Sequence, residues 1–139
     1  MAPPQTSVRA YGVLILEGRV LLVRASSPAI DPPVWWLPGG GLNFAESPQE
    51  ALAREFEEET GLLVAELELR DVLSDVRRRP NGDKVHSVRV IYRVQLAGGR
   101  LRDEQHGTTD RAQWFRVDSL DEVNLAIYTR HALSVVLGK

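Results

Sequence analysis

The chain has 139 residues, a formal net charge of −2 and a hydrophobic content of 43%. This length is typical of a single domain with an apolar core, and the near-neutral charge gives no electrostatic reason for general binding to nucleic acids or anionic membranes. Because the sequence contains no cysteine, it excludes disulfides, thiol catalysis and metal sites with cysteine ligands.

Residues 1–7 are rich in proline and are expected to be flexible, so that the domain spans residues 8–139. They lack the basic and apolar regions of a signal peptide, and no apolar stretch of the sequence is long enough to cross a bilayer. We therefore expect a cytoplasmic protein without membrane contact.

The first predicted elements are strands. Residues 8–16 and 19–25 are rich in β-branched and apolar side chains, which predicts a hairpin or two neighbouring strands with a tight link. Residues 8–16 could also form an edge strand that pairs with a second copy, so a homodimer is one expectation. Three prolines make residues 26–33 a loop, and residues 34–37 are a short strand that ends before a proline and three glycines.

The helix that follows has clear boundaries. Ser47 is a good N-cap, Pro48 fits the first helical position, and Glu50 completes a Ser-x-x-Glu capping box. Gly61 follows the last turn, where a left-handed cap favours glycine.

The rest of the chain predicts a hairpin, a further strand, a helical turn and a terminal helix. These elements occupy residues 62–73 and 85–96, 112–117, 118–119 and 128–137, in that order. An Asn-Gly pair at positions 81–82 marks the hairpin turn. Strands with interspersed helices indicate one α/β domain.

Three carboxylates of the helix share one side. At about 100° per residue, Glu59 projects close to the apolar position Leu52, Glu55 lies about 60° away, and Glu58 lies further round the same side. Glu57 alone points well away. Because anions beside a core must raise their pKa or find a cation, this placement indicates a metal site.

The alternative is an exposed, Glu-rich helix in which Arg54 pairs with Glu58 one turn on. Such a pair stabilises a helix by only a few tenths of a kcal/mol, on the order of 0.3, and cannot offset three clustered anions. Carboxylate oxygens favour Mg²⁺, with Mn²⁺ as a substitute. The glycines at 39–41 would let a backbone carbonyl approach the same metal.

These residues resemble a known family. Gly40, Glu46 and the segment Arg-Glu-Phe-Glu-Glu-Glu-Thr-Gly-Leu at 54–62 are similar to the Nudix box in its full spacing, over Gly40 to Leu62. Phe56 departs mildly from the usual branched aliphatic residue. The Trp-Trp-Leu-Pro-Gly-Gly segment at 35–40 and the Trp-Phe pair at 114–115 also match the family's order of elements.

The resemblance implies an α/β/α sandwich with a mixed sheet and Mg²⁺-dependent hydrolysis of a diphosphate linked to another group. It implies that Glu55, Glu58 and Glu59 are metal ligands, assisted by the Gly40 carbonyl. Either Glu55 or Glu58 would also be the base for water. By the same resemblance, Arg54 would orient the glutamates and Glu46 would steady the junction of loop and helix.

Many family members supply a further acidic residue from the loop before the late strand. In this chain Arg111 stands where glutamate is often expected, so Glu104 or Asp110 would serve, unless the loop is only a solvated polar segment.

Other candidates for substrate binding are aromatic and basic residues. Trp35 could stack on a base or be part of the core, whereas Trp36 should face the opposite side of the strand. Arg24 could bind a substrate phosphate or lie on the surface. The basic cluster at 77–79 could be a solvated hairpin tip, or it could attract a polyphosphate or an RNA 5′ end. An RNA 5′ end is the only nucleic acid that we consider as a partner.

The sequence thus predicts a Nudix pyrophosphohydrolase whose substrate is a nucleoside triphosphate or a modified nucleotide. The alternatives are hydrolysis of ADP-ribose, of a nucleotide-sugar or of a dinucleoside polyphosphate. From a different class, a catalytically silent Nudix domain could bind nucleotides as a sensor.

Overall fold

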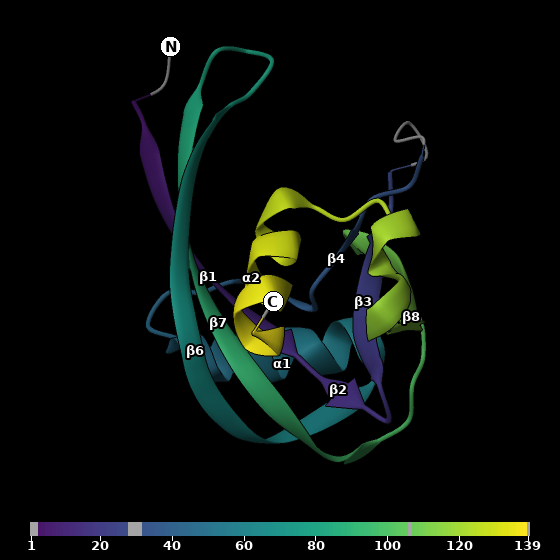
Figure 1. The fold of residues 1–139 in the computed structure, drawn as a ribbon. Helices are drawn as coiled ribbons and strands as arrows, with labels where there is room; N and C mark the ends of the chain where they lie inside the picture. The colour runs from purple at the N-terminus through teal and green to yellow at the C-terminus, as the bar shows by residue number, and fades with distance from the viewer. Residues whose placement is uncertain (1–2, 28–31, 106, 139) are drawn as a thin grey trace.

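The computed structural model describes residues 3–27, 32–105 and 107–138, and Figure 1 shows the arrangement of its helices and strands. The elements are β1 (Gln5–Val13), β2 (Ile15–Leu16), β3 (Arg19–Ala25), β4 (Trp35–Trp36), β5 (Gly39–Gly41), α1 (Pro48–Thr60), β6 (Leu62–Arg78), β7 (Lys84–Gly99), β8 (Thr109–Arg116), η1 (Val117–Glu122) and α2 (Ile127–Leu137).

The strands form two sheets. In the first sheet the order is β5-β1-β7-β6, and it is mixed because β1 runs parallel to β7 while the other pairs are antiparallel. In the second sheet β3 pairs with β2, β4 and β8, all antiparallel. In Figure 1 the long β6–β7 hairpin extends beyond the rest of the fold, beside the start of β1.

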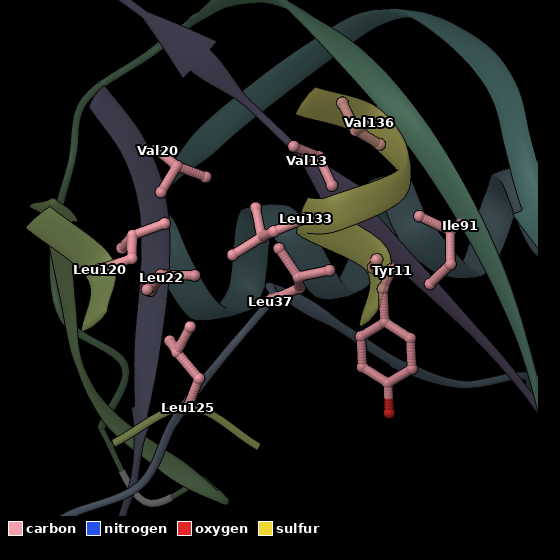
Figure 2. Close-up of a cluster of buried hydrophobic side chains, with 11 residues drawn as sticks. Tyr11, Val13, Val20, Leu22, Leu37, Ile91, Leu120, Leu125, Leu133 and Val136 are labelled. Carbon is pink, nitrogen blue, oxygen red and sulfur yellow. The ribbon is translucent and has the colours of Figure 1, made fainter. Parts of the chain in front are cut away.

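The two helices cover opposite faces of the sheets. Successive residues of a strand point to opposite faces, and accordingly Ala10 and Leu21 belong to one buried cluster while Tyr11 and Leu22 belong to the other. The first cluster packs against α1 through Phe56 and its neighbours. Figure 2 shows the second, in which Leu133 and Val136 of α2 point toward side chains of β1 and β3. The predicted α/β/α sandwich with a mixed sheet is confirmed.

The predictions about the first strands hold only in part. A hairpin with a tight link is present, but only the two-residue β2 at the end of the run 8–16 folds back on β3, because β1 ends at Val13. The expected edge strand is wrong, since β1 lies between β5 and β7. The continuous burial of Ala10 to Leu14 agrees with this central place, because a strand covered on both faces reads as an unbroken apolar run.

The glycines at 39–41 form strand β5 against β1 and are more than a loop. Gly39 has φ of 146°, and a Cβ there would clash with the carbonyl oxygen of Ala10. Glycine at this position therefore allows β5 to lie close against β1.

The remaining expected elements are present. The capping box of Ser47 and Glu50 is formed, and Gly61 ends α1 in the left-handed conformation. Both hairpin strands extend further toward the turn than predicted. The predicted loop at 26–33 lies partly outside the described residues. Within the described part of the chain, no helix is long and apolar enough to cross a membrane.

Candidate active site

Helix α1 arranges the three carboxylates by depth. Glu59 is 2% exposed, whereas the side chain of Glu55 is 21% exposed and that of Glu58 is 50% exposed. The deepest carboxylate accepts a hydrogen bond at 2.7 Å from the backbone N–H of Gly39. The helical spacing placed Glu59 beside the core-facing side of the helix, and the structure shows in addition that helix α1 and the glycine strand β5 meet there.

Glu59 is in an environment that opposes its negative charge. Its pKa is raised from 4.5 to about 9, mainly by burial and in smaller part by the negative charges of Glu55, Glu104 and Glu58. The Gly39 hydrogen bond acts in the opposite direction but is smaller in effect. A single neutral donor cannot compensate for a carboxylate removed from water among other acids.

Arg54 connects the acidic residues. Its guanidinium binds Glu46 in a fork, with Nε–Oε2 and Nη2–Oε1 both at 2.9 Å, and donates to Glu55 Oε1 at 2.8 Å. It also donates to the Gly41 carbonyl at 3.0 Å. The bonds from Arg54 lower the pKa of Glu46 to about 2. The pairing of Arg54 with Glu58, at 3.6 Å, is the longest of these contacts.

Gly40 allows the Glu55 carboxylate to lie against the glycine strand. A Cβ at Gly40 would lie 2.8 Å from Glu55 Cδ, closer than real Cβ atoms approach other carbons. Burial is the main factor that raises the pKa of Glu55, and the Arg54 hydrogen bond opposes it. Glycine at position 40 therefore leaves the space that the Glu55 carboxylate occupies.

The variant Gly40→Ala tests this packing. If Glu55 is a metal ligand, activity should fall roughly tenfold, because the new methyl group displaces its carboxylate, while the melting temperature changes little, since the end of a flexible side chain can move. The matched control is Gly41→Ala, whose Cβ would meet only Arg9 Nη1 at 3.6 Å. Equal kcat in the two variants would contradict the assignment.

The structure favours Glu104 over Asp110 as the further acid. Glu104 accepts a hydrogen bond from Thr109 Oγ1 at 2.9 Å, and its charge raises the pKa of both Glu55 and Glu59. It also lines an open pocket of about 370 Å³ together with Glu58. Asp110 instead pairs with Arg24.

Two residues that the sequence suggested for substrate binding, Arg24 and Trp35, do not line the cavity that contains Glu59. Arg24 donates to both carboxylate oxygens of Asp110, at 2.8 and 3.0 Å, and lies 5.9 Å from the Trp35 ring. Trp35 packs edge-on against Phe115 at 4.7 Å. The strand alternation turns the other tryptophan, Trp36, to the cavity that also contains Glu59.

The cavity that contains Glu59, called the main cavity from here on, has a volume of about 340 Å³. It reaches from Gly39 and Glu59 to Arg77 and Arg79. Its wall includes residues that the sequence did not single out, namely Arg9, Tyr11, Arg89 and Tyr128. They lie on β1, β7 and α2. The alternation of side chains could have indicated a common face for the residues of the two strands. No pattern in the sequence indicated that these residues line one cavity.

The acids suit a divalent metal by their chemistry. In the positions that the structure gives to the described residues, no three histidine or acidic side chains converge on one metal-sized point; Arg54 holds Glu55 and Gly39 holds Glu59. Yet Glu55, Glu58 and Glu104 are close enough to Glu59 to raise its pKa. Four neighbouring carboxylates with one guanidinium among them supply the hard oxygen donors that fit Mg²⁺ or Mn²⁺.

Comparisons with known proteins show which family and which proteins this chain is similar to. A family model described as the NUDIX domain matches residues 6–134. A MutT-like protein of Streptomyces ambofaciens is 32% identical over 138 residues, which cover 99% of this chain and 81% of that protein. A protein of Mycobacterium tuberculosis, described as putative 8-oxo-dGTP diphosphatase 2, is 34% identical over 68% of this chain and 64% of its own length.

A solved structure of a related protein has a similar fold. The MutT NUDIX hydrolase of Burkholderia pseudomallei superimposes with a TM-score of 0.80 at 29% identity, over 95% of this chain and 98% of that chain.

Proposed function

Because the chain belongs to the Nudix hydrolase family, we propose that it hydrolyses a nucleoside triphosphate or a modified form of one, with Mg²⁺ as the metal. One observation carries the proposal: Glu59 is buried at 2% exposure beside Glu55 and Glu58, in the wall of a cavity with aromatic side chains. Buried, mutually repelling carboxylates need a cation, and a nucleotide diphosphate brings its own anionic groups to such a metal.

Each acidic residue then has a role. Glu55, Glu58 and Glu59 would hold the metal, with the Gly40 carbonyl assisting. When bound, the metal neutralises the diphosphate and lowers the pKa of a coordinated water. Either Glu58, whose side chain is 50% exposed, or Glu55, whose side chain is 21% exposed, would accept the proton of the attacking water. Arg54 orients Glu55, and Glu46 fixes Arg54.

The nucleoside would lie in the main cavity. Trp36 contributes a partly exposed aromatic ring to its wall, and stacking on such a ring stabilises a base by about 1–3 kcal/mol. The relatives named MutT-like protein and putative 8-oxo-dGTP diphosphatase support a triphosphate. ADP-ribose, nucleotide-sugars and dinucleoside polyphosphates are the other substrates to compare.

A nucleotide panel with Mg²⁺ tests this proposal. Pyrophosphatase added to the triphosphate reactions, and alkaline phosphatase added to the linked diphosphates, convert the expected products to free phosphate. We expect release from at least one canonical or oxidised nucleoside triphosphate, and none after chelation with EDTA. Nucleotide binding by calorimetry without turnover of any member of the panel would instead support a non-catalytic sensor.

A further inference from the structure

The main cavity is longer than the chemistry at its acidic end requires. Tyr11 pairs with Gly39 beside Glu59, and β1 then runs six residues to Gln5, which pairs with Val85 on β7; Val85 in turn pairs with Arg77 on β6. At about 3.3 Å per residue, the two ends lie about 20 Å apart. Both ends line the same cavity, so a bound nucleoside would leave room at the far end.

The far end is positively charged. Arg77 and Arg79 line it and Arg9 lies between the two ends. None of these three arginines forms an ion pair with an acid in the described part of the chain. Among the described residues, the Arg9 side chain donates from Nε to the Tyr11 hydroxyl at 2.7 Å, and its terminal nitrogens remain for another acceptor.

Arg89 is held differently and supports the cavity wall. It is 8% exposed, donates to Asp75 at 2.8 Å and to the Tyr11 hydroxyl at 3.0 Å, and lies 4.0 Å from the centre of the Tyr128 ring. This network fixes Tyr11, which pairs with Gly39 at the acidic end, and Tyr128, whose ring lies under Arg89. The cavity wall therefore combines the Glu59 carboxylate, aromatic rings and free guanidinium groups.

The three arginines at the hairpin tip, Arg77, Arg78 and Arg79, differ in whether they line the cavity. Arg77 and Arg79 line the cavity, but Arg78 does not; its Nη1 donates across the turn to the Gly82 carbonyl at 3.3 Å. The alternation of side chains along β6 produces this difference. A solvated basic tip would give no reason for two of the three arginines to share a cavity with Glu59.

We propose that Arg77 and Arg79, with Arg9, bind a phosphate group that the enzyme does not hydrolyse, on the far side of the nucleoside from the diphosphate. The proposal rests on the proposed function, which places the diphosphate at the carboxylates. Guanidinium groups bind phosphate oxygens through paired, charge-assisted hydrogen bonds. The group would be attached at the ribose 3′ position, either as a 3′-phosphate of a mononucleotide or as the first internucleotide phosphate of a 5′-phosphorylated oligonucleotide.

The test compares three substrates that differ only at the 3′ position: guanosine 5′-triphosphate, its 3′-phosphorylated form, and a 5′-triphosphorylated dinucleotide. We expect KM to be about tenfold lower for at least one 3′-phosphorylated substrate, as for a charged hydrogen-bonded contact. The substrate with the larger gain identifies the source of the phosphate. Equal KM values for all three would overturn the proposal.

The matched variants are Arg77→Gln with Arg79→Gln, against Arg78→Gln. The double variant should lose the tenfold preference, whereas Arg78→Gln should keep it, and all should turn over the plain triphosphate with unchanged kcat. Loss of the preference in Arg78→Gln alone would also overturn the proposal, since that side chain lies outside the cavity.

A binding measurement separates this proposal from the proposed function. Guanosine 3′-monophosphate has no diphosphate to hydrolyse, and calorimetry without metal should detect it on the wild type and at least tenfold more weakly on the double variant. This result could hold even if no nucleotide were hydrolysed. Conversely, triphosphate hydrolysis with no difference between wild type and double variant in guanosine 3′-monophosphate binding would leave the enzyme function intact and refute the phosphate site.

Discussion

Replacing Glu59 by glutamine is expected to lower kcat by at least about 100-fold and to raise the melting temperature of the metal-free protein. Mutation of groups that only support metal ligands reduces activity or metal affinity by about 10–100-fold, so loss of a proposed ligand should have at least the larger effect. Glutamine keeps the shape of the side chain, and its oxygen can still accept the Gly39 hydrogen bond.

The gain in stability follows from the pKa of Glu59. Burial raises it from 4.5 to about 9 in the folded protein, so the unfolded chain loses its proton more readily than the folded protein. The charge of Glu59 therefore opposes folding increasingly as the pH rises from about 4.5 to about 9. The difference in melting temperature between Glu59→Gln and wild type should be small at pH 5 and should grow toward pH 9.

Thermal unfolding with and without Mg²⁺, combined with kinetics, checks both effects. Mg²⁺ should raise the melting temperature of the wild type by mass action and should have much less effect on the variant. The control is Glu57→Gln, which makes the same charge change on the exposed side of α1. Full activity in Glu59→Gln would defeat the metal assignment, and a lower metal-free melting temperature would refute the electrostatic argument.

Replacing Arg54 by alanine is expected to reduce activity by about 10–100-fold without removing any proposed ligand. Arg54 holds Glu55 at 2.8 Å and is itself held by the fork from Glu46. Without the guanidinium, Glu55 is free to rotate and Glu46 loses its partner. The loss should appear both as weaker Mg²⁺ activation and as a lower kcat.

The contribution of the Arg54–Glu46 pair to stability should grow with pH, whereas the charge of Glu59 lowers stability as the pH rises. The Arg54 hydrogen bonds, together with a smaller effect of the Asn43 N–H, lower the folded pKa of Glu46 from 4.5 to about 2. The pair of Arg54 and Glu46 therefore stabilises the fold above about pH 4.5 and loses that effect as the pH falls toward 2. Arg54→Ala should therefore melt below the wild type at pH 7, and the gap should narrow on acidification.

Two further variants identify the cause. Arg54→Lys keeps the charge but cannot make the fork, so it should restore only part of the activity. Adding Glu46→Gln to Arg54→Ala should have little additional effect, because the two residues act through one contact. If Arg54→Lys is as active as the wild type, charge alone suffices and the orienting role is refuted.

The sequence by itself determined the helix and its acidic face. The capping box, the terminal glycine and the 3.6-residue period are local properties, so the boundaries of α1 and the shared side of Glu55, Glu58 and Glu59 follow from nearby residues alone. The resemblance in box spacing also predicted the family, which the match over residues 6–134 confirms.

Tertiary structure alone decided which distant residues join that helix. The parallel pairing of β1 with β7 joins residues about 80 positions apart in the chain and brings Arg9 beside Arg89. Placement of Glu104 near Glu59, of Trp36 rather than Trp35 in the cavity, and of Arg77 and Arg79 but not Arg78 also depends on strand pairing and orientation. Strand pairing is non-local, and a shift of one residue would turn each side chain to the opposite face, so a single sequence does not fix these contacts.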